Sequence, residues 1–212
     1  MVSDNIKETT DVLTPRHVLE TWFKDDNSGR MDLAQPKRWF MGGAALDQKL
    51  KSLYSQTLKQ AGTNKLDHWL DSIQGTLALI VVLDQFNRNI NRGTAAAFKH
   101  DAKAVAASKH ALTMGYTAQL PVSQRMFCYM PFEHDESAES QSQSVALFKQ
   151  LREDAPTTEY SEFADRALAS AIEHKDIIDK FGRYPHRNAV LGRASTEEEL
   201  AWLDNENKRF GQ

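Results

Sequence analysis

Seven consecutive apolar residues, Leu77 to Leu83, form the longest apolar run in the chain. A run of this length fits a buried strand or part of a buried helix, and periodicity alone does not separate the two. The segment continues without a turn signal as far as Gly93, and no second β-branched run exists with which a strand could pair. Residues 76–90 are therefore predicted to form a central buried helix. The run is too short to cross a bilayer.

The rest of the chain shows further segments with helical spacing of apolar side chains, joined by short links. Several begin at a capping residue or a proline and end near a glycine or a proline. The predicted starts are Thr14, Ala44, Leu66, Thr94, Pro121, Asp135, Thr158 and Ser195 or Thr196. The last two offer overlapping capping boxes with Glu198 and Glu199. Pro131 is expected to end the helix that Pro121 opens, because proline lacks the backbone N–H of a helix interior. This pattern predicts an all-α single domain of about eight helices over residues 1–212, with a flexible N-terminus over residues 1–13.

The composition of the chain excludes several classes of protein. Of the 212 residues, 41% are hydrophobic, which is enough to build a core. Lys and Arg number 26 against 29 Asp and Glu, and this net charge of −3 gives no general attraction for nucleic acid or an anionic membrane. The single cysteine excludes an intrachain disulfide and fits a reducing compartment, and residues 1–10 are too polar for a signal peptide. We therefore predict a cytoplasmic protein without nucleic-acid or membrane partners.

Three segments carry polar residues that a plain helical bundle does not need. In the first, Asp84, Arg88 and Arg92 follow the apolar run at intervals of four and therefore share one face of a helix. Either these charges pair with one another as the helix leaves the core, or the arginines face a ligand. In the second case Gln85 and Asn89 would help to orient that ligand.

The second segment is Pro131 to Glu136, where His134 stands among carboxylates at what the pattern predicts to be the start of a helix. A histidine beside an acid can serve as a general base or as a metal ligand. No second histidine lies at a metal-binding spacing, so no metal site is predicted. Acids at a helix start also complement the helix dipole, which explains Glu136 but not His134.

The third segment is the turn from Lys180 to Arg193, which holds four cations and a histidine without a carboxylate. Arginines bind carboxylate or phosphate groups bidentately, and Phe181 and Tyr184 could stack on a planar ligand. The alternative is that the arginines neutralise acids such as Asp84, Glu133 and Glu136. His174, in the helix before this turn, is a further candidate, although a lone histidine on such a face is more often a hydrogen-bonded core residue.

Together these segments resemble a widespread, mainly bacterial family of unknown function. The motifs that carry the resemblance are Leu83 to Phe86, Arg88 to Ile90, Arg92-Gly93, Pro131, Glu133-His134, Glu136, Gln141, His174, Phe181 to Asn188, Leu191 to Arg193, Thr196 and Glu198-Glu199, with Trp39-Phe40 and Asp47 upstream. The resemblance covers about residues 15 to 205. It implies a fold similar to tetratricopeptide-repeat proteins, with helices packed as hairpins, and it implies no reaction or cofactor.

Two functions remain open at this point. One is a polar site for a small anionic molecule, in an enzyme or in a binding protein, and the other is a helical interaction module for a peptide or a partner protein. The candidates for proton transfer are His134, Glu136 and His186. The candidates for ligand binding are Gln85, Arg88, Asn89, Arg92, His174, Arg183, Arg187, Asn188 and Arg193.

The distribution of these residues favours the anion site. A peptide groove needs apolar anchors spread along the chain, whereas the polar candidates are concentrated in three segments. We expect Arg88, His134 and Arg187 to lie around one cavity. No phosphate loop, nucleophile elbow or metal-ligand spacing is present, so neither a cofactor nor a metal is predicted.

Overall fold

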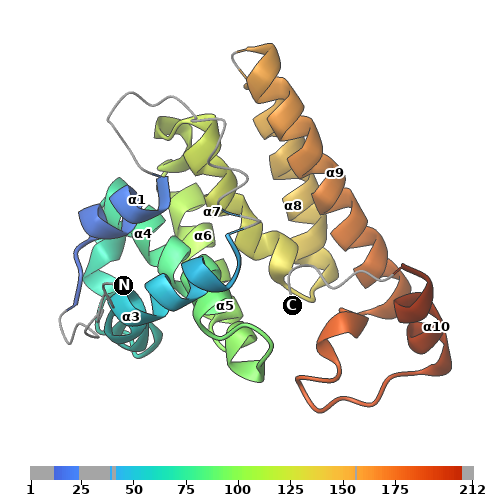
Figure 1. Cartoon of the computed structure of the whole chain (residues 1–212). Helices are drawn as coiled ribbons and strands as arrows, with labels where there is room; N and C mark the ends of the chain where they lie inside the picture. The colour runs from blue at the N-terminus through green and yellow to red at the C-terminus, as the bar shows by residue number, and fades with distance from the viewer. Residues whose placement is uncertain (1–11, 24–38, 40–41, 156, 207–212) are drawn as a thin grey trace, which may run out of the picture. The chain divides into compact units, whose positions relative to one another are not determined.

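The computed structural model describes residues 12–23, 39, 42–155 and 157–206 (Figure 1), and these ranges contain helices and no strand. The all-α prediction is confirmed. The α-helices are α1 (Pro15–Phe23), α3 (Gly43–Gly62), α4 (Ile73–Val81), α5 (Asn87–Ile90), α6 (Asp101–Thr113), α7 (Val122–His134), α8 (Ala138–Glu153), α9 (Thr158–Phe181) and α10 (Glu197–Glu206). Shorter turns of helix are η1 (Asp67–Asp71), η2 (Val82–Phe86), η3 (Ala95–Phe98), η4 (Thr117–Gln119) and η5 (Pro185–Arg187).

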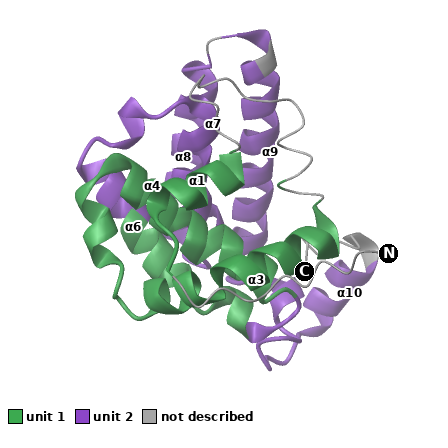
Figure 2. Cartoon of the chain, turned by 60° about the vertical axis from the view of Figure 1, so that its left-hand side comes forward, with its two compact units in different colours: residues 1–92, 96–107 green, residues 93–95, 108–212 purple. Residues whose placement is uncertain are grey.

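The chain separates into two compact units (Figure 2). Unit 1 comprises residues 1–92 and 96–107, and unit 2 comprises residues 93–95 and 108–212, so that α6 begins in one unit and ends in the other. The single domain over residues 1–212 stays a prediction. Most of the N-terminus expected to be flexible lies outside the described residues, but the backbone N–H of Leu13 donates to Thr57 Oγ1 at 3.0 Å.

The core of unit 1 is built on the long apolar run. Every residue from Leu77 to Leu83 is at most 1% exposed, and the predicted central helix is present. It is not uniform, because α4 passes into a turn of π-helix, η2, before α5 begins. Helix α1 packs against α4, and α3 packs against η2 and α5. The sequence gives no sign of the π-helical turn, a feature often found at functional sites.

One expected helix of unit 1 is interrupted. Residues 94–114 were expected to form a continuous helix, but η3 ends at Phe98 and α6 begins at Asp101. The side-chain amide of Asn87 donates to the backbone carbonyls of Ala96 (3.0 Å) and Ala97 (2.8 Å). These bonds fix the short turn against α5, which ends a few residues before it.

Unit 2 contains the hairpin of α8 and α9, and α7 packs against both of these helices. The prediction that Pro131 ends a helix is wrong, because α7 continues through it to His134. His134 therefore lies at the end of a helix and not at its start. Gln141 supports this end, since its Nε2 donates to the carbonyl of Asp135 at 2.6 Å and lies 2.8 Å from the carbonyl oxygen of Glu133.

The caps of the next two helices differ from those expected. Ser137, not Asp135, caps α8 by accepting a hydrogen bond from Ser140 N. Thr157, not Thr158, caps α9 by accepting from Tyr160 N. In both cases the cap lies immediately before the first helical residue, where a side-chain oxygen can reach the free N–H groups. Gly182 ends α9 as predicted, in the left-handed conformation at φ 69°.

The buried run allows a direct test of the core of unit 1. Ile80→Asp places a carboxylate at a position that is fully buried in α4, and we expect the variant to unfold. An unpaired buried charge costs several kcal/mol, a large part of the roughly 5–15 kcal/mol that stabilises a typical domain. Circular dichroism and thermal melting measure the effect. The matched control is Ile172→Asp on α9, where the side chain is 41% exposed; equal melting temperatures for the two variants would contradict the assignment.

Candidate functional site

The candidate residues form two sets, one in each unit. Gln85, Arg88, Asn89 and Arg92 belong to unit 1, and the remaining candidates belong to unit 2. The meeting of Arg88 with His134 and Arg187 around one cavity stays a prediction.

In unit 1, Arg88 lies between two carboxylates. Its Nε donates to Asp84 Oδ1 at 3.2 Å and its Nη2 donates to Asp101 Oδ1 at 2.9 Å. Burial disfavours the charge of Arg88, but the two carboxylates outweigh this effect and raise its pKa. Gln85 Nε2 donates to Asp84 Oδ2 at 2.6 Å. This is the arrangement that the ion-pair interpretation of the segment expects.

Arg92 does not extend this pairing along the helix. It binds Asp47 of α3 through Nε (2.7 Å) and Nη2 (3.1 Å), and Asn89 Nδ2 donates to the same carboxylate at 2.7 Å. Burial alone would raise the pKa of Asp47, but the hydrogen bonds from Arg92 and Asn89 bring this pKa below its ordinary value. Both residues therefore connect α5 to α3.

In unit 2, Arg183 is held by Glu199 of α10. The guanidinium donates to both carboxylate oxygens, at 2.7 and 2.9 Å, and also to the carbonyl of Ala194 at 2.8 Å. Glu199 is 2% exposed. The hydrogen bond from Arg183 is the largest influence on this carboxyl, and together with the bond from Thr196 N it lowers the pKa of Glu199 to about 2.

Glu199 also completes a capping box. Thr196 N donates to Glu199 Oε2 at 2.7 Å, and Glu199 N donates to Thr196 Oγ1 at 3.2 Å. Of the two overlapping boxes that the sequence offers, this one forms. Ser195 instead accepts a hydrogen bond from Asn188 Nδ2 at 3.0 Å, and the same amide donates to Glu199 Oε2 at 3.2 Å.

A second carboxylate, Glu136, holds the other side of the Arg-rich turn. Arg193 binds it with two hydrogen bonds of 2.6 and 2.9 Å, and Tyr184 N donates to it at 2.8 Å. Burial would raise the pKa of Glu136, but Arg193 and the Tyr184 N–H lower it. Glu136 is thus kept ionised at neutral pH. This environment suits an anchor for the turn better than the proton-transfer role expected from the sequence.

Four rings of unit 2 form a continuous row, which we call the histidine row: His134, His174, Tyr184 and His186. Successive ring centroids are 6.4, 5.5 and 5.4 Å apart. The guanidinium of Arg187 lies 4.4 Å from the centroid of the Tyr184 ring. The structure therefore brings together five residues that the sequence analysis named. They come from α7, α9 and the turn around η5.

The two ends of the histidine row differ from its centre in accessibility. Tyr184 and His174 are buried, whereas His134 and His186 are partly exposed. Phe181 and Tyr184, the rings that could stack on a planar ligand, already contact other side chains. Tyr184 is contacted by His174, His186 and Arg187, and Phe181 packs edge-on against Trp202 at 5.6 Å.

The carboxylate of Glu133 lies beside His174, the second ring of the row. Glu133 Oε1 lies 3.1 Å from His174 Nδ1 and accepts a hydrogen bond from Ser170 Oγ at 2.8 Å. Nδ1 is also 2.9 Å from the carbonyl oxygen of Ser170, and a carbonyl can only accept, so Nδ1 carries a proton. In the neutral ring the basic atom is then Nε2. A carboxylate that holds a histidine in one tautomer is the arrangement of a general base.

Two buried side chains fix the histidine row to the end of α7. Gln141 Nε2 donates to Tyr184 Oη at 2.8 Å, and Tyr184 Oη donates to the carbonyl of Glu133 at 2.5 Å. Burial raises the pKa of Tyr184 far above its ordinary value, so the phenol remains a donor. Sequence reasoning did not select Glu133 as a site residue, although it directly precedes His134; the link to His174 depends on how α7 and α9 pack.

The described residues contain neither a metal-binding group of three or more side chains nor a membrane-spanning helix. No group of three or more His, Cys, Asp or Glu side chains in the described ranges could hold a metal ion. In the same ranges, no helix has the combination of length and apolar character needed to span a membrane.

Comparison with known proteins assigns the chain to a family. The model of a bacterial protein family of unknown function, DUF924, matches residues 18–207, and the chain belongs to this family. A solved structure of a protein of unknown function from Agrobacterium tumefaciens is similar to it, with 32% sequence identity and a TM-score of 0.76 over 90% of this chain and 97% of that chain. No curated protein matches the chain. The resemblance inferred from the motifs is confirmed, and the tetratricopeptide-like arrangement stays a prediction.

The bond between Arg183 and Glu199 predicts an acid-sensitive stability. Because the pKa of Glu199 is about 2 when folded, against an ordinary value of 4.5, this carboxylate stabilises the fold fully above about pH 4.5. That contribution is lost as the pH falls from about 4.5 to about 2. We expect Glu199→Gln to melt a few degrees below the wild type at pH 7, with the difference shrinking over this pH range.

The matched control is Glu198→Gln, in which the changed side chain is 67% exposed and pairs with Lys180 at 3.2 Å. Its melting temperature should follow that of the wild type at every pH, since exposed ion pairs contribute little. If Glu199→Gln and Glu198→Gln behaved alike throughout the titration, the low pKa of Glu199 would be refuted.

Proposed function

We propose that this protein binds a small anionic molecule at the histidine row and Arg187 of unit 2, with His174 as the proton acceptor beside it. The observation that carries the proposal is the row itself, together with the carboxylate of Glu133 behind His174. Three histidines and a guanidinium gathered by α7, α9 and η5 combine positive charge with a group that can exchange a proton near neutral pH.

The charge balance around the histidine row supports an anionic ligand. Three carboxylates belong to this network, and three arginines accompany them. The carboxylates are Glu133, Glu136 and Glu199, and the arginines are Arg183, Arg187 and Arg193. With neutral histidines these charges cancel, so each histidine that gains a proton leaves a net positive charge. An anion bound there compensates that charge.

The three arginines have different tasks in this proposal. Arg183 and Arg193 each bind one carboxylate through two hydrogen bonds and hold the turn in place. Arg187 is 6% exposed and stacks on the Tyr184 ring beside the partly exposed His186. It therefore brings a permanent positive charge to the end of the histidine row that solvent can reach.

Exposed apolar side chains give less support to an interaction module. The large hydrophobic residues that are exposed in the described ranges are Met114 (52%), Ile172 (41%) and Leu200 (52%). They follow α6 and lie in α9 and α10, respectively, and so do not form a series of anchors along one helix. Peptide grooves rely on clustered apolar anchors, so these positions favour the anion site.

Sulfate tests this proposal, because it remains a dianion between pH 6 and pH 8. We expect sulfate to raise the melting temperature, because an anion bound beside the guanidinium of Arg187 stabilises the folded protein and not the unfolded chain. At about ten times its Kd, a ligand adds about 1.4 kcal/mol of stability. For a chain of this size that corresponds to a rise of about 3–6 °C. Sodium chloride keeps the ionic strength constant.

Two variants separate a specific site from a general salt effect. Arg187→Met should lose most of the sulfate-dependent rise. Arg152→Met is the matched control, since Arg152 of α8 is 50% exposed and pairs with Asp165, and it should retain the rise. An equal rise in both variants would refute binding at the histidine row.

A further inference from the structure

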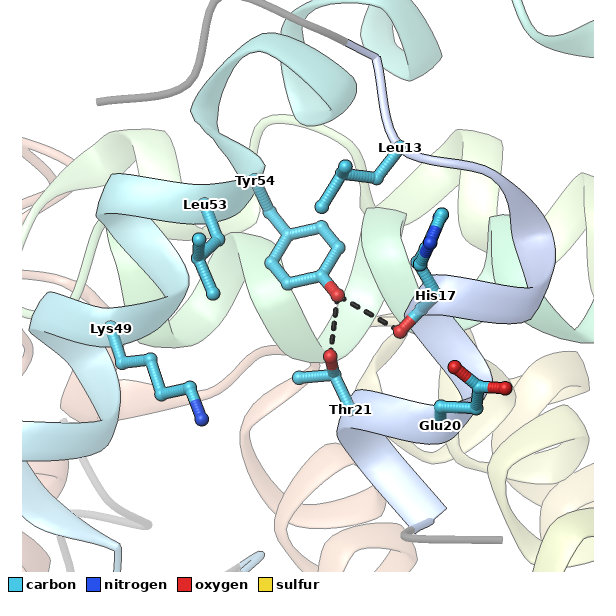
Figure 3. A pocket seen from close by; sticks show the side chains of 7 residues that line it. All are labelled: Leu13, His17, Glu20, Thr21, Lys49, Leu53 and Tyr54. Carbon is cyan, nitrogen blue, oxygen red and sulfur yellow. Dashed lines mark hydrogen bonds between the residues drawn. The ribbon is translucent and has the colours of Figure 1, made fainter. Parts of the chain in front are cut away.

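Unit 1 contains a cavity that is independent of the histidine row. It has a volume of about 380 Å³ and lies between α1 and α3 (Figure 3). Its lining residues are Leu13, His17, Glu20, Thr21, Lys49, Leu53 and Tyr54. This volume is in the range of pockets that hold small molecules.

The floor of this cavity presents apolar surface. Tyr54 is 1% exposed, and its hydroxyl donates to the carbonyl of His17 at 2.9 Å and lies 2.5 Å from Thr21 Oγ1. The polar atom of the tyrosine is thus already bonded to α1. The Tyr54 ring and the side chains of Leu13 and Leu53 remain to face a ligand, and they suit an apolar body.

Two of the polar groups at the rim are tied to α1 itself. Glu20 Oε1 accepts from Arg16 Nε at 2.6 Å. His17 takes part in the N-terminal cap of α1, where Thr14 N donates to His17 Nδ1 at 3.4 Å and His17 N donates to Thr14 Oγ1 at 3.5 Å. These contacts complete a capping box in which a histidine replaces the usual glutamate.

Lys49 is the charged residue on the opposite wall. It extends from α3 towards α1 below the Tyr54 ring (Figure 3). Among the described residues no hydrogen bond or ion pair engages its ammonium group. The cavity therefore combines an apolar floor with one positive charge that the described part of the chain does not neutralise.

From this geometry we infer that the cavity between α1 and α3 binds a small carboxylate with an apolar body. The body lies against Leu13, Leu53 and the Tyr54 ring, and the carboxylate pairs with Lys49 Nζ. This site is separate from the anion site proposed in unit 2, because its lining comes entirely from α1, α3 and Leu13, two residues before α1. It selects its ligand by apolar contact as well as by charge.

The probe is phenylacetate, compared with the uncharged phenylacetamide and followed by backbone amide NMR shifts. We expect phenylacetate to shift the amides of Thr21, Lys49 and Leu53 in a saturable way. It should bind about two- to five-fold more tightly than phenylacetamide, as an exposed ion pair allows. Lys49→Gln should remove this preference for the charged probe.

The matched control is Lys51→Gln, an exposed lysine on the same helix that does not line the cavity. It should keep the preference. The inference is overturned if phenylacetamide binds as tightly as phenylacetate, if both lysine variants lose the preference, or if no saturable shift occurs. Shifts confined to the amides of His134, His186 and Arg187 would also overturn it, while supporting the separate site in unit 2.

Discussion

The buried amide of Gln141 is the contact on which the arrangement of unit 2 depends. It is fully buried, and its nitrogen lies within hydrogen-bond distance of carbonyls at the end of α7 and of the phenol of Tyr184. A helix end leaves four carbonyls without a helical partner, and burying them unbonded is costly. Gln141 satisfies this requirement and joins α7 to the turn after α9. The position of Glu133 beside His174 follows from the same junction.

The arginines around this junction differ in their binding partners and therefore in their roles. Arg183 and Arg193 are each bound by a carboxylate from another element, with Glu199 and Glu136 as partners. Removing either partner would leave a partly buried charge without compensation, which is the costly case for an ion pair. The turn is therefore held by its charges. The proposed contacts with a ligand fall to Arg187 and the histidines, which lie along the Tyr184 ring and its neighbours.

Local signals predicted much of the fold, and long-range contacts explain what they missed. The start of α1 at Thr14, the end of α9 at Gly182 and the box of Thr196 with Glu199 need only neighbouring residues. Pro131 was read as a helix end because proline lacks a backbone N–H, but α7 continues for three more residues. The carbonyl of Glu133 at its end is bound by Tyr184, which stands outside the local pattern. The π-helical turn within the apolar run likewise leaves no periodic signal.

The difference between local sequence signals and long-range contacts also applies to the candidate site. The sequence identified the residues of the histidine row, and it named Glu136 among the acids that arginines of the turn could bind, but it did not pair Arg183 with Glu199. The residue type indicates whether a side chain can carry a charge or a proton. The residues that bind this side chain in the folded protein decide whether its charge is already compensated. Glu136 shows this most clearly, since Arg193 and Tyr184 N keep it ionised. A proton-transfer role therefore fits His174, which a carboxylate orients, better than Glu136, which the sequence named as a candidate for that role.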